Sequence, residues 1–259
     1  MCLLSSDNNI EIFINVEISK KNMDYFTNSW KHFIPHKTRI ENLKSLAKLI
    51  ENFDIVGLQE LDGGSFRSGF LNQAEYIAMA AGFECWYDKI NRNIGPVARH
   101  SMGILSRIKP ASVERHDLPG LPGRGTIAMS YGSRNALGII LTHLSLGKKA
   151  RLKQIDFLCE LVKDFRSVVL MGDLNCGPES EEILKLKSKC NLRDSGSAVP
   201  SFPSWEPVQR LDHILVSSGL KIKSSGVLGW KLSDHLPVSM EVETSGINLD
   251  YSPKARKAA

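Results

Sequence analysis

The five cysteines of this 259-residue chain include no CxxC pair, and their number is odd. This pattern argues against a disulfide framework and against a cysteine zinc site, and it fits a reducing compartment best. No apolar run approaches the roughly 18 residues of a membrane span, so we expect no stable membrane insertion. The first residues lack a basic stretch followed by a long apolar one, which predicts a cytoplasmic protein without a secretory signal. Export by a route that reads no such signal stays open.

A strong excess of charge of one sign is also missing. Lys and Arg number 33 against 28 Asp and Glu, so the formal net charge is +5. This mild basicity suits an anionic substrate, but it lacks the dense basic stripe of a dedicated nucleic-acid binder. The apolar fraction of 42% is that of an ordinary globular chain with a substantial core.

The apolar pattern predicts a single α/β domain. Apolar residues recur at helical spacing over 39–52, 71–81 and 151–165. Short apolar runs typical of strands include 10–16, 54–58, 126–131, 136–142, 167–171, 211–216 and 238–242. We therefore expect one domain over residues 1–245, with two mixed, mostly antiparallel sheets packed face to face and helices outside. Residues 246–259 read as a basic, flexible tail.

Side chains that can do chemistry stand where apolar runs end. Asp173 follows one run after a single glycine, Gly172, and the two-residue period of a strand puts Asn175 on the same side. Glu60 follows another run closely, and Asp234-His235 comes shortly before the last. Converging carboxylates repel unless a cation lies between them, so the pattern predicts an oxygen-ligand divalent-metal site. A metal-assisted attack on a phosphate ester is the hypothesis that follows.

Two histidines are candidates for contact with a phosphate. A neutral His235 can receive a proton, but its second ring nitrogen must be fixed, and Asp212 is the candidate carboxylate. His143 follows the apolar run 136–142 directly. His213 is one residue from Asp212, so strand alternation should turn it to the opposite face, and we interpret it as structural.

Each motif also has a purely structural interpretation. The Gly-Asp-Leu-Asn sequence at 172–175 could form an Asx-type turn. Glu60 could be a solvated strand end, Asp212 a strand charge facing water, and His143 a core histidine bonded to a carbonyl.

Two residues in loops are candidates for substrate binding. Arg124, in a Gly-Arg-Gly segment, could grip a phosphate or could simply be an exposed loop arginine. Trp205 lies in a Ser/Pro-rich loop before Asp212 and could form a wall against the substrate.

Taken in order, the motifs resemble the endonuclease/exonuclease/phosphatase superfamily, whose members are DNase I-like, and its small bacterial members in particular. The likeness runs from about Asn15 to Val242. Its blocks are Asn15, Gln59-Glu60, His143, Gly172-Asp173-Leu174-Asn175, Leu211-Asp212-His213-Ile214 and Ser233-Asp234-His235. Any one block is weak, whereas all of them in this order are specific. The resemblance implies a four-layer α/β sandwich and dependence on Mg²⁺ (or Mn²⁺).

The resemblance also implies which residues hold the metal. Asn15, Glu60 and Asp234 would do so, directly or through water. The block around Asn15 is reduced to little more than the asparagine. A second departure is Ser101-Met102-Gly103, where many relatives carry Gly-Asn, so an amide near the cleft is expected to be missing.

Catalytic roles follow from the same resemblance. Asp173 would orient or deprotonate the attacking water, and Asn175 would contact the phosphate. His235, held by Asp212, would also contact the phosphate. His143 would steady the transition state or the leaving group.

The expected activity is hydrolysis of phosphate esters by in-line attack of an activated water. A phosphodiesterase, with nuclease activity among the options, is the first interpretation. A phosphomonoesterase or phospholipase-type enzyme acting on a lipid headgroup or a small metabolite is the alternative, and a non-catalytic binding module is a third. The expected partner is therefore a phosphate-ester substrate, and the chain is expected to act as a monomer.

Overall fold

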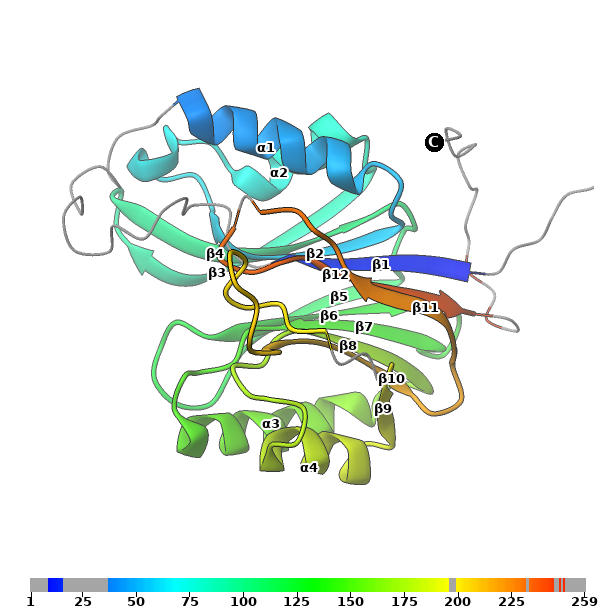
Figure 1. The fold of residues 1–259 in the computed structure, drawn as a ribbon. Coiled ribbons are helices and arrows are strands. Elements are labelled where there is room, and N and C mark those ends of the chain that lie inside the picture. Colours follow the sequence, from blue (N-terminus) through cyan, green and yellow to red (C-terminus); the bar gives the residue numbers. More distant parts are fainter. Residues whose placement is uncertain are drawn as a thin grey trace, which may run out of the picture.

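The structure is a computed structural model that describes residues 9–15, 37–195, 199–231, 233–244, 247 and 249, without the side chains of 13–15, 37 and 38. Two six-stranded sheets lie face to face, and a pair of helices covers the outer face of each (Figure 1). This arrangement confirms the predicted four-layer α/β sandwich. The predicted tail, apart from residues 247 and 249, lies outside the described residues.

The first sheet has the order β11-β12-β1-β2-β4-β3. Its strands are β1 (Asn9–Asn15), β2 (Ile55–Asp62), β3 (Cys85–Ile94), β4 (Ala98–Ser106), β11 (Lys221–Val227) and β12 (Val238–Glu243). β1 and β2 run parallel, and the other neighbours in this sheet are antiparallel. Helices α1 (Lys37–Ile50) and α2 (Gln73–Ala81) pack on its outer face (Figure 1). The central strand β2 is therefore buried almost throughout.

The second sheet has the order β5-β6-β7-β8-β10-β9. Its strands are β5 (Ser112–Asp117), β6 (Gly125–Tyr131), β7 (Leu137–Thr142), β8 (Ser167–Asp173), β9 (Leu192–Asp194) and β10 (Asp212–Ser217). Here β7 and β8 are the parallel pair. Helices α3 (Lys148–Val162) and α4 (Glu181–Lys189) cover the outer face. The prediction of mixed, mostly antiparallel sheets is confirmed.

Three apolar clusters hold the layers together. The central one lies between the sheets and includes Ile12, Met102 and Ile214. A second joins α1 and α2 to the first sheet, and a third joins α3 and α4 to the second sheet. Ile247 and Leu249 pack against the central cluster. None of the helices in the described part of the chain has the length and apolar character to cross a bilayer.

Local signals set the ends of α2, which begins two residues later than the expected helix over 71–81. The Asn72 side chain accepts hydrogen bonds from the backbone N–H groups of Ala74 and Glu75, which caps the first turn. The helix ends at Gly82, whose φ of 71° is a left-handed conformation that glycine adopts without strain. A short 3-10 helix, η2 (Phe66–Ser68), precedes α2.

Candidate active site

The candidate site lies where the two sheets meet at one end, and the β8–β10 ladder defines it. β10 runs antiparallel to β8 in a register that sets Asp212 directly opposite Asp173. Both carboxylates are buried, with exposed fractions of 2% and 3%. The structure therefore brings together two acidic residues that are distant in sequence.

Gln59 and Gly172 lock the sheets together behind these carboxylates. The Gln59 side chain donates to the carbonyl of Thr142 (2.6 Å) and accepts from the N–H of Asp173 (3.1 Å), so it links β2 to β7 and β8. Gly172 has a φ of 150°, and a Cβ there would lie 1.8 Å from the Thr142 carbonyl oxygen. Only glycine fits this close approach of two backbones.

His143 lies between the carboxylates of Asp173 and Glu60. Its Nε2 lies 3.4 Å from Asp173 Oδ2 and 3.9 Å from Glu60 Oε1. The imidazole is buried, whereas the Glu60 side chain is 36% exposed and borders the open cleft. Glu60 itself has a positive φ of 52° within β2, where the β2–β4 register shifts. The β-bulge turns this strand end towards the site.

Arg124 contributes a positive charge to the same cluster. Its Nη1 lies 2.9 Å from Nδ1 and 3.0 Å from Nε2 of His143. Burial lowers the pKa of Arg124, and the charges of Glu60 and Asp173 oppose that effect. Arg124 is therefore part of the candidate site, and the interpretation as a simple exposed loop arginine is wrong.

His235 forms the second imidazole–carboxylate pair. Its Nδ1 lies 2.8 Å from Asp212 Oδ2, and the Ser201 hydroxyl donates to the same oxygen at 2.5 Å. Because a carboxylate only accepts, Nδ1 must carry the proton, which leaves Nε2 as the nitrogen able to contact a substrate. The Phe202 ring packs against the imidazole with centroids 4.6 Å apart.

The charges of the site shift several pKa values. Burial lowers the pKa of His235, but the Asp212 carboxylate, with Asp173 and Asp234 behind it, raises the pKa to about 9. Burial raises the pKa of Asp173, and the hydrogen bond and charge of His143 more than offset this, so the net shift is downward. The two pairs therefore act on each other electrostatically.

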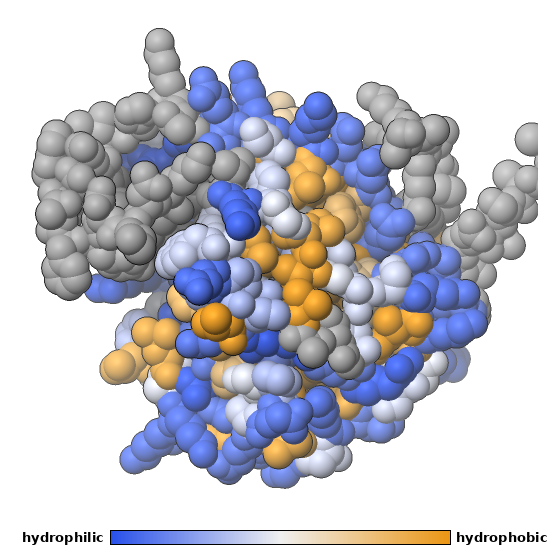
Figure 2. Space-filling view, in the orientation of Figure 1, coloured by the Kyte–Doolittle hydropathy of each residue, from blue (hydrophilic) through white to orange (hydrophobic). Residues whose placement is uncertain are grey.

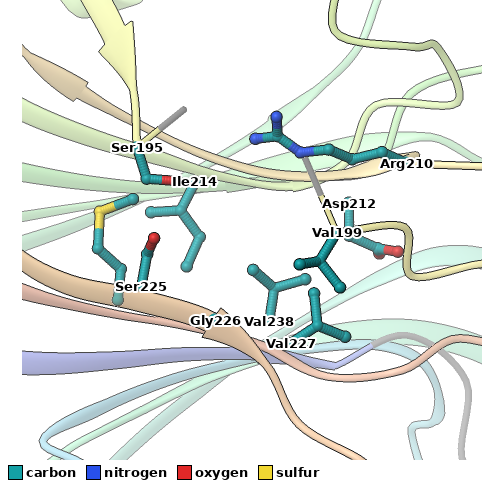
Figure 3. Close-up of a pocket in the computed structure, with 10 residues that line it drawn as sticks. Ser195, Val199, Arg210, Asp212, Ile214, Ser225, Gly226, Val227 and Val238 are labelled. Carbon is teal, nitrogen blue, oxygen red and sulfur yellow. The ribbon is translucent and has the colours of Figure 1, made fainter. Parts of the chain in front are cut away.

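A small cavity of about 10 Å³ adjoins Asp212 and is lined mainly by apolar side chains. Figure 3 shows Val199, Ile214, Val227 and Val238 around it, from β10, β11, β12 and the loop before β10. No hydrogen bond reaches Oδ1 of Asp212 from the residues that the structure describes. An apolar backing of this kind strengthens the hydrogen bonds that Asp212 Oδ2 accepts from His235 and Ser201, because the local dielectric is low.

Three other residues were singled out in the sequence, namely Asn175, Asn15 and His213. Asn175 has a left-handed φ of 51°, and its Nδ2 donates to the Leu144 carbonyl at 2.8 Å, which leaves a second amide hydrogen for a ligand. Its N–H also donates to Asp173, as the Asx-turn interpretation expected. Asn15 ends β1 beside Leu58, but its side chain lies outside the described part. His213 points away from the site and bonds the Cys176 carbonyl at 2.8 Å, which agrees with a structural role.

Glu60 and Asp234 are the described candidates for a divalent cation. Neither is fully buried, so each is accessible to a hydrated ion. In the described ranges no three Asp, Glu, His or Cys side chains form a metal cluster. Mg²⁺, however, uses one or two carboxylates and keeps several waters, so these hard oxygen donors fit such an ion.

Trp205 occupies the turn of a loop that is tied to the candidate site. Ser204, which precedes Trp205, donates its N–H to the Asp234 carbonyl at 2.7 Å and its hydroxyl to the Ser233 carbonyl. The indole is 54% exposed. Contact of Trp205 with a substrate stays a prediction.

Two contributors were given no role from the sequence. Gln59 was part of a motif without an assigned role, and Ser201-Phe202-Pro203 was a further match to the family, also without a role. Only the fold brings the Ser201 hydroxyl against Asp212.

An open cleft of about 510 Å³ begins at Glu60 and His143. It lies between the β3–β4 end of the first sheet and the loops that follow β5 and β7. Leu121 and Leu146, from these two loops, line it and are 82% and 76% exposed. Figure 2 shows apolar side chains gathered on the side where these loops project in Figure 1.

The chain combines a two-sheet sandwich with paired carboxylates and imidazoles at one end. Comparison with known proteins identifies the family of such proteins to which it belongs. The sequence profile of the Endonuclease/Exonuclease/phosphatase family matches residues 39–235. The chain belongs to this family, whose members are hydrolases acting on phosphate esters. No curated protein matches the chain significantly.

Solved structures share this fold at low sequence identity. A mannosyl-6-phosphatase of Bacteroides thetaiotaomicron has a TM-score of 0.68 at 18% identity, over 90% of this chain and 99% of its own. ANGEL2, a 2',3'-cyclic phosphatase, has a TM-score of 0.68 at 13% identity, over 90% and 95%. The catalytic domain of human Nocturnin, with a bound sulfate, has a TM-score of 0.66 at 17% identity, over 91% and 94%. These likenesses show the fold.

Proposed function

We propose that this protein is a metal-dependent phosphodiesterase that cleaves its substrate by in-line attack of a water molecule. The observation that carries the proposal is the β8–β10 register, which sets Asp173 and Asp212 opposite each other, each with its own imidazole. Two such pairs can remove a proton from water and offset negative charge on one phosphate.

The water-activating role belongs to Asp173 in this proposal. Its carboxylate only accepts hydrogen bonds, and its backbone is held by Gln59, so it is oriented before substrate binds. Asn175 offers its second amide hydrogen to a phosphate oxygen. His143, backed by Arg124, stabilises the charge that develops on the transition state or on the leaving oxygen.

The phosphate-binding role belongs to His235. The Asp212 and Ser201 contacts fix the orientation of its ring, so that Nε2 can hydrogen bond a phosphate oxygen. Glu60 and Asp234, with Asn15, would hold Mg²⁺ or Mn²⁺. When bound, such an ion polarises the phosphate and neutralises charge in the transition state.

Phosphomonoester hydrolysis is the second candidate. It is favoured by one protein of this fold, whose name describes a mannosyl-6-phosphatase, whereas a 2',3'-cyclic phosphate, named for the other, is a cyclic diester. A monoester carries one more negative charge than a diester at neutral pH. The preference between the two therefore depends on how much positive charge surrounds the phosphate.

Hydrolysis of bis-p-nitrophenyl phosphate and p-nitrophenyl phosphate, with Mg²⁺, Mn²⁺ or EDTA, tests the proposal. We expect metal-dependent release of p-nitrophenol that EDTA abolishes and that Asp173→Asn lowers at least 100-fold. The variant preparation also controls for contaminating nucleases and phosphatases. Absence of turnover with either substrate and metal, or full activity in Asp173→Asn, would refute the proposal.

A further inference from the structure

The open cleft beside the candidate site has an excess of positive charge. The charged residues in its lining are Arg92 and Arg124 against one carboxylate, Glu60. Arg92 is exposed at the end of β3, and in the described part of the chain it forms no ion pair. A cleft with excess positive charge attracts anionic groups.

Unsatisfied polar atoms line the floor of the same cleft. Ser101, on β4, is 2% exposed, and no described group hydrogen bonds its hydroxyl. Asn91 Oδ1 is likewise buried without a described partner, pressed so close to Gly125 that a Cβ there would meet it at 2.3 Å. Buried polar atoms without partners are uncommon, and both residues line the cleft.

The rim of the cleft is apolar. Leu121 and Leu146 are 82% and 76% exposed, although side chains of this size are usually covered. The cleft thus has a basic end, a polar floor and an apolar rim, which is typical of a ligand site that binds a charged organic molecule.

We infer that this cleft binds a second, non-scissile phosphate of the substrate through Arg92, with the intervening sugar-like scaffold lying over Ser101. The inference rests on the proposed function, because the scissile phosphate occupies the site at Glu60 and His143. Arg92 suits this role, because its planar guanidinium can form two parallel hydrogen bonds with a phosphate. The substrate class is therefore a bisphosphorylated compound with a hydroxyl-bearing scaffold.

Two matched substrates test this inference with the full chain. One is the p-nitrophenyl ester of thymidine 5'-phosphate, and the other is the same ester with an added 3'-phosphate. Both have the same scissile bond and leaving group. We expect a KM about 5- to 10-fold lower for the 3'-phosphorylated ester with little change in kcat, because a charge-assisted contact at an exposed residue contributes moderately.

Arg92→Gln should remove this difference while it leaves KM for the unphosphorylated ester unchanged. Arg134→Gln is the matched control, because Arg134 is an exposed arginine in the turn between β6 and β7, far along the strands from the Gly125 end. It loses the same charge and should keep the wild-type preference. Higher salt should weaken the preference. Equal KM values in the wild type, or a preference that survives in Arg92→Gln, overturn the inference.

A failure of the proposed function is distinguishable from a failure of this inference. If neither ester is cleaved, calorimetric binding of thymidine 3',5'-bisphosphate is compared with that of thymidine 5'-phosphate. Tighter binding of the bisphosphate that Arg92→Gln removes supports the second-phosphate site in a non-catalytic protein. Equal binding of the two nucleotides overturns the site as well.

Discussion

Replacing Ser201 by alanine will weaken catalysis without disturbing any group that touches the substrate. The Ser201 hydroxyl is fully buried and donates at 2.5 Å to Asp212 Oδ2, the oxygen that also holds His235 Nδ1. Without it, the Asp212 carboxylate keeps only the side-chain hydrogen bond from His235 among the described residues and can rotate about its Cβ–Cγ bond. The imidazole then loses a fixed orientation.

The size of the effect follows from this hydrogen bond. A buried hydrogen bond to a charged group contributes about 1.5 to 3 kcal/mol. Since about 1.4 kcal/mol corresponds to a factor of ten, a loss felt in the transition state lowers kcat/KM roughly 10- to 100-fold. Loss of an outer residue that orients a catalytic group typically has an effect of about this size.

Ser130→Ala is the matched control. Ser130 is also buried, at 2%, and its hydroxyl donates to Asn135 Oδ1 at 2.8 Å near the opposite end of β6. Urea denaturation should show a loss of unfolding free energy of about 1.5 to 3 kcal/mol for Ser201→Ala and about 0.5 to 1.5 kcal/mol for Ser130→Ala, whose partner is neutral. Only Ser201→Ala should lose activity on bis-p-nitrophenyl phosphate. If Ser201→Ala keeps activity within about twofold of wild type while it loses stability, the role assigned to the Asp212–His235 pair is wrong.

Three further perturbations test other parts of the structure. Gly172→Ala will lower Tm by roughly 10 °C or more, or prevent folding, because its Cβ would collide with a backbone carbonyl. Acidification will destabilise the protein as the pH falls below about 3.9, because the Arg210 guanidinium outweighs burial and holds the pKa of Asp194 below its usual value. Oxidised glutathione will join Cys159 and Cys190, whose sulfur atoms lie 2.7 Å apart, into a disulfide with release of two reduced glutathione molecules.

Each of these predictions has its own control and measurement. Gly177→Ala should be mild in thermal denaturation, because no atom lies within 4 Å of a Cβ there. In Asp194→Asn the unfolding free energy should fall less between pH 5 and pH 2 than in wild type, because a lowered folded-state pKa stabilises only above it. Peptide mapping under non-reducing conditions should detect the disulfide-linked peptides in the oxidised wild type and not in Cys159→Ser. The opposite result in any of the three contradicts the corresponding contact.

Most helices and strands could be predicted from local pattern, whereas the strands β9 and β11 were missed. The expected helix over 39–52 is α1 (Lys37–Ile50), and that over 151–165 is α3 (Lys148–Val162). Their apolar residues recur every three to four positions, because one face packs on a sheet. The parallel pairs β1–β2 and β7–β8 were beyond local pattern, since pairing depends on which strands the whole chain brings together.

The sequence by itself determined which side chains could do the chemistry, because the positions of the carboxylates and imidazoles along the chain do not depend on the fold. Only the tertiary structure decided which of them meet. Gln59 and Asp173 lie 114 residues apart in sequence and are joined by one hydrogen bond. Arg124 and Ser201 became part of the site for the same reason, since their contacts with His143 and Asp212 arise from strand register and loop packing. Contacts between such distant segments exist only after the sheets have packed, so no short stretch of sequence encodes them.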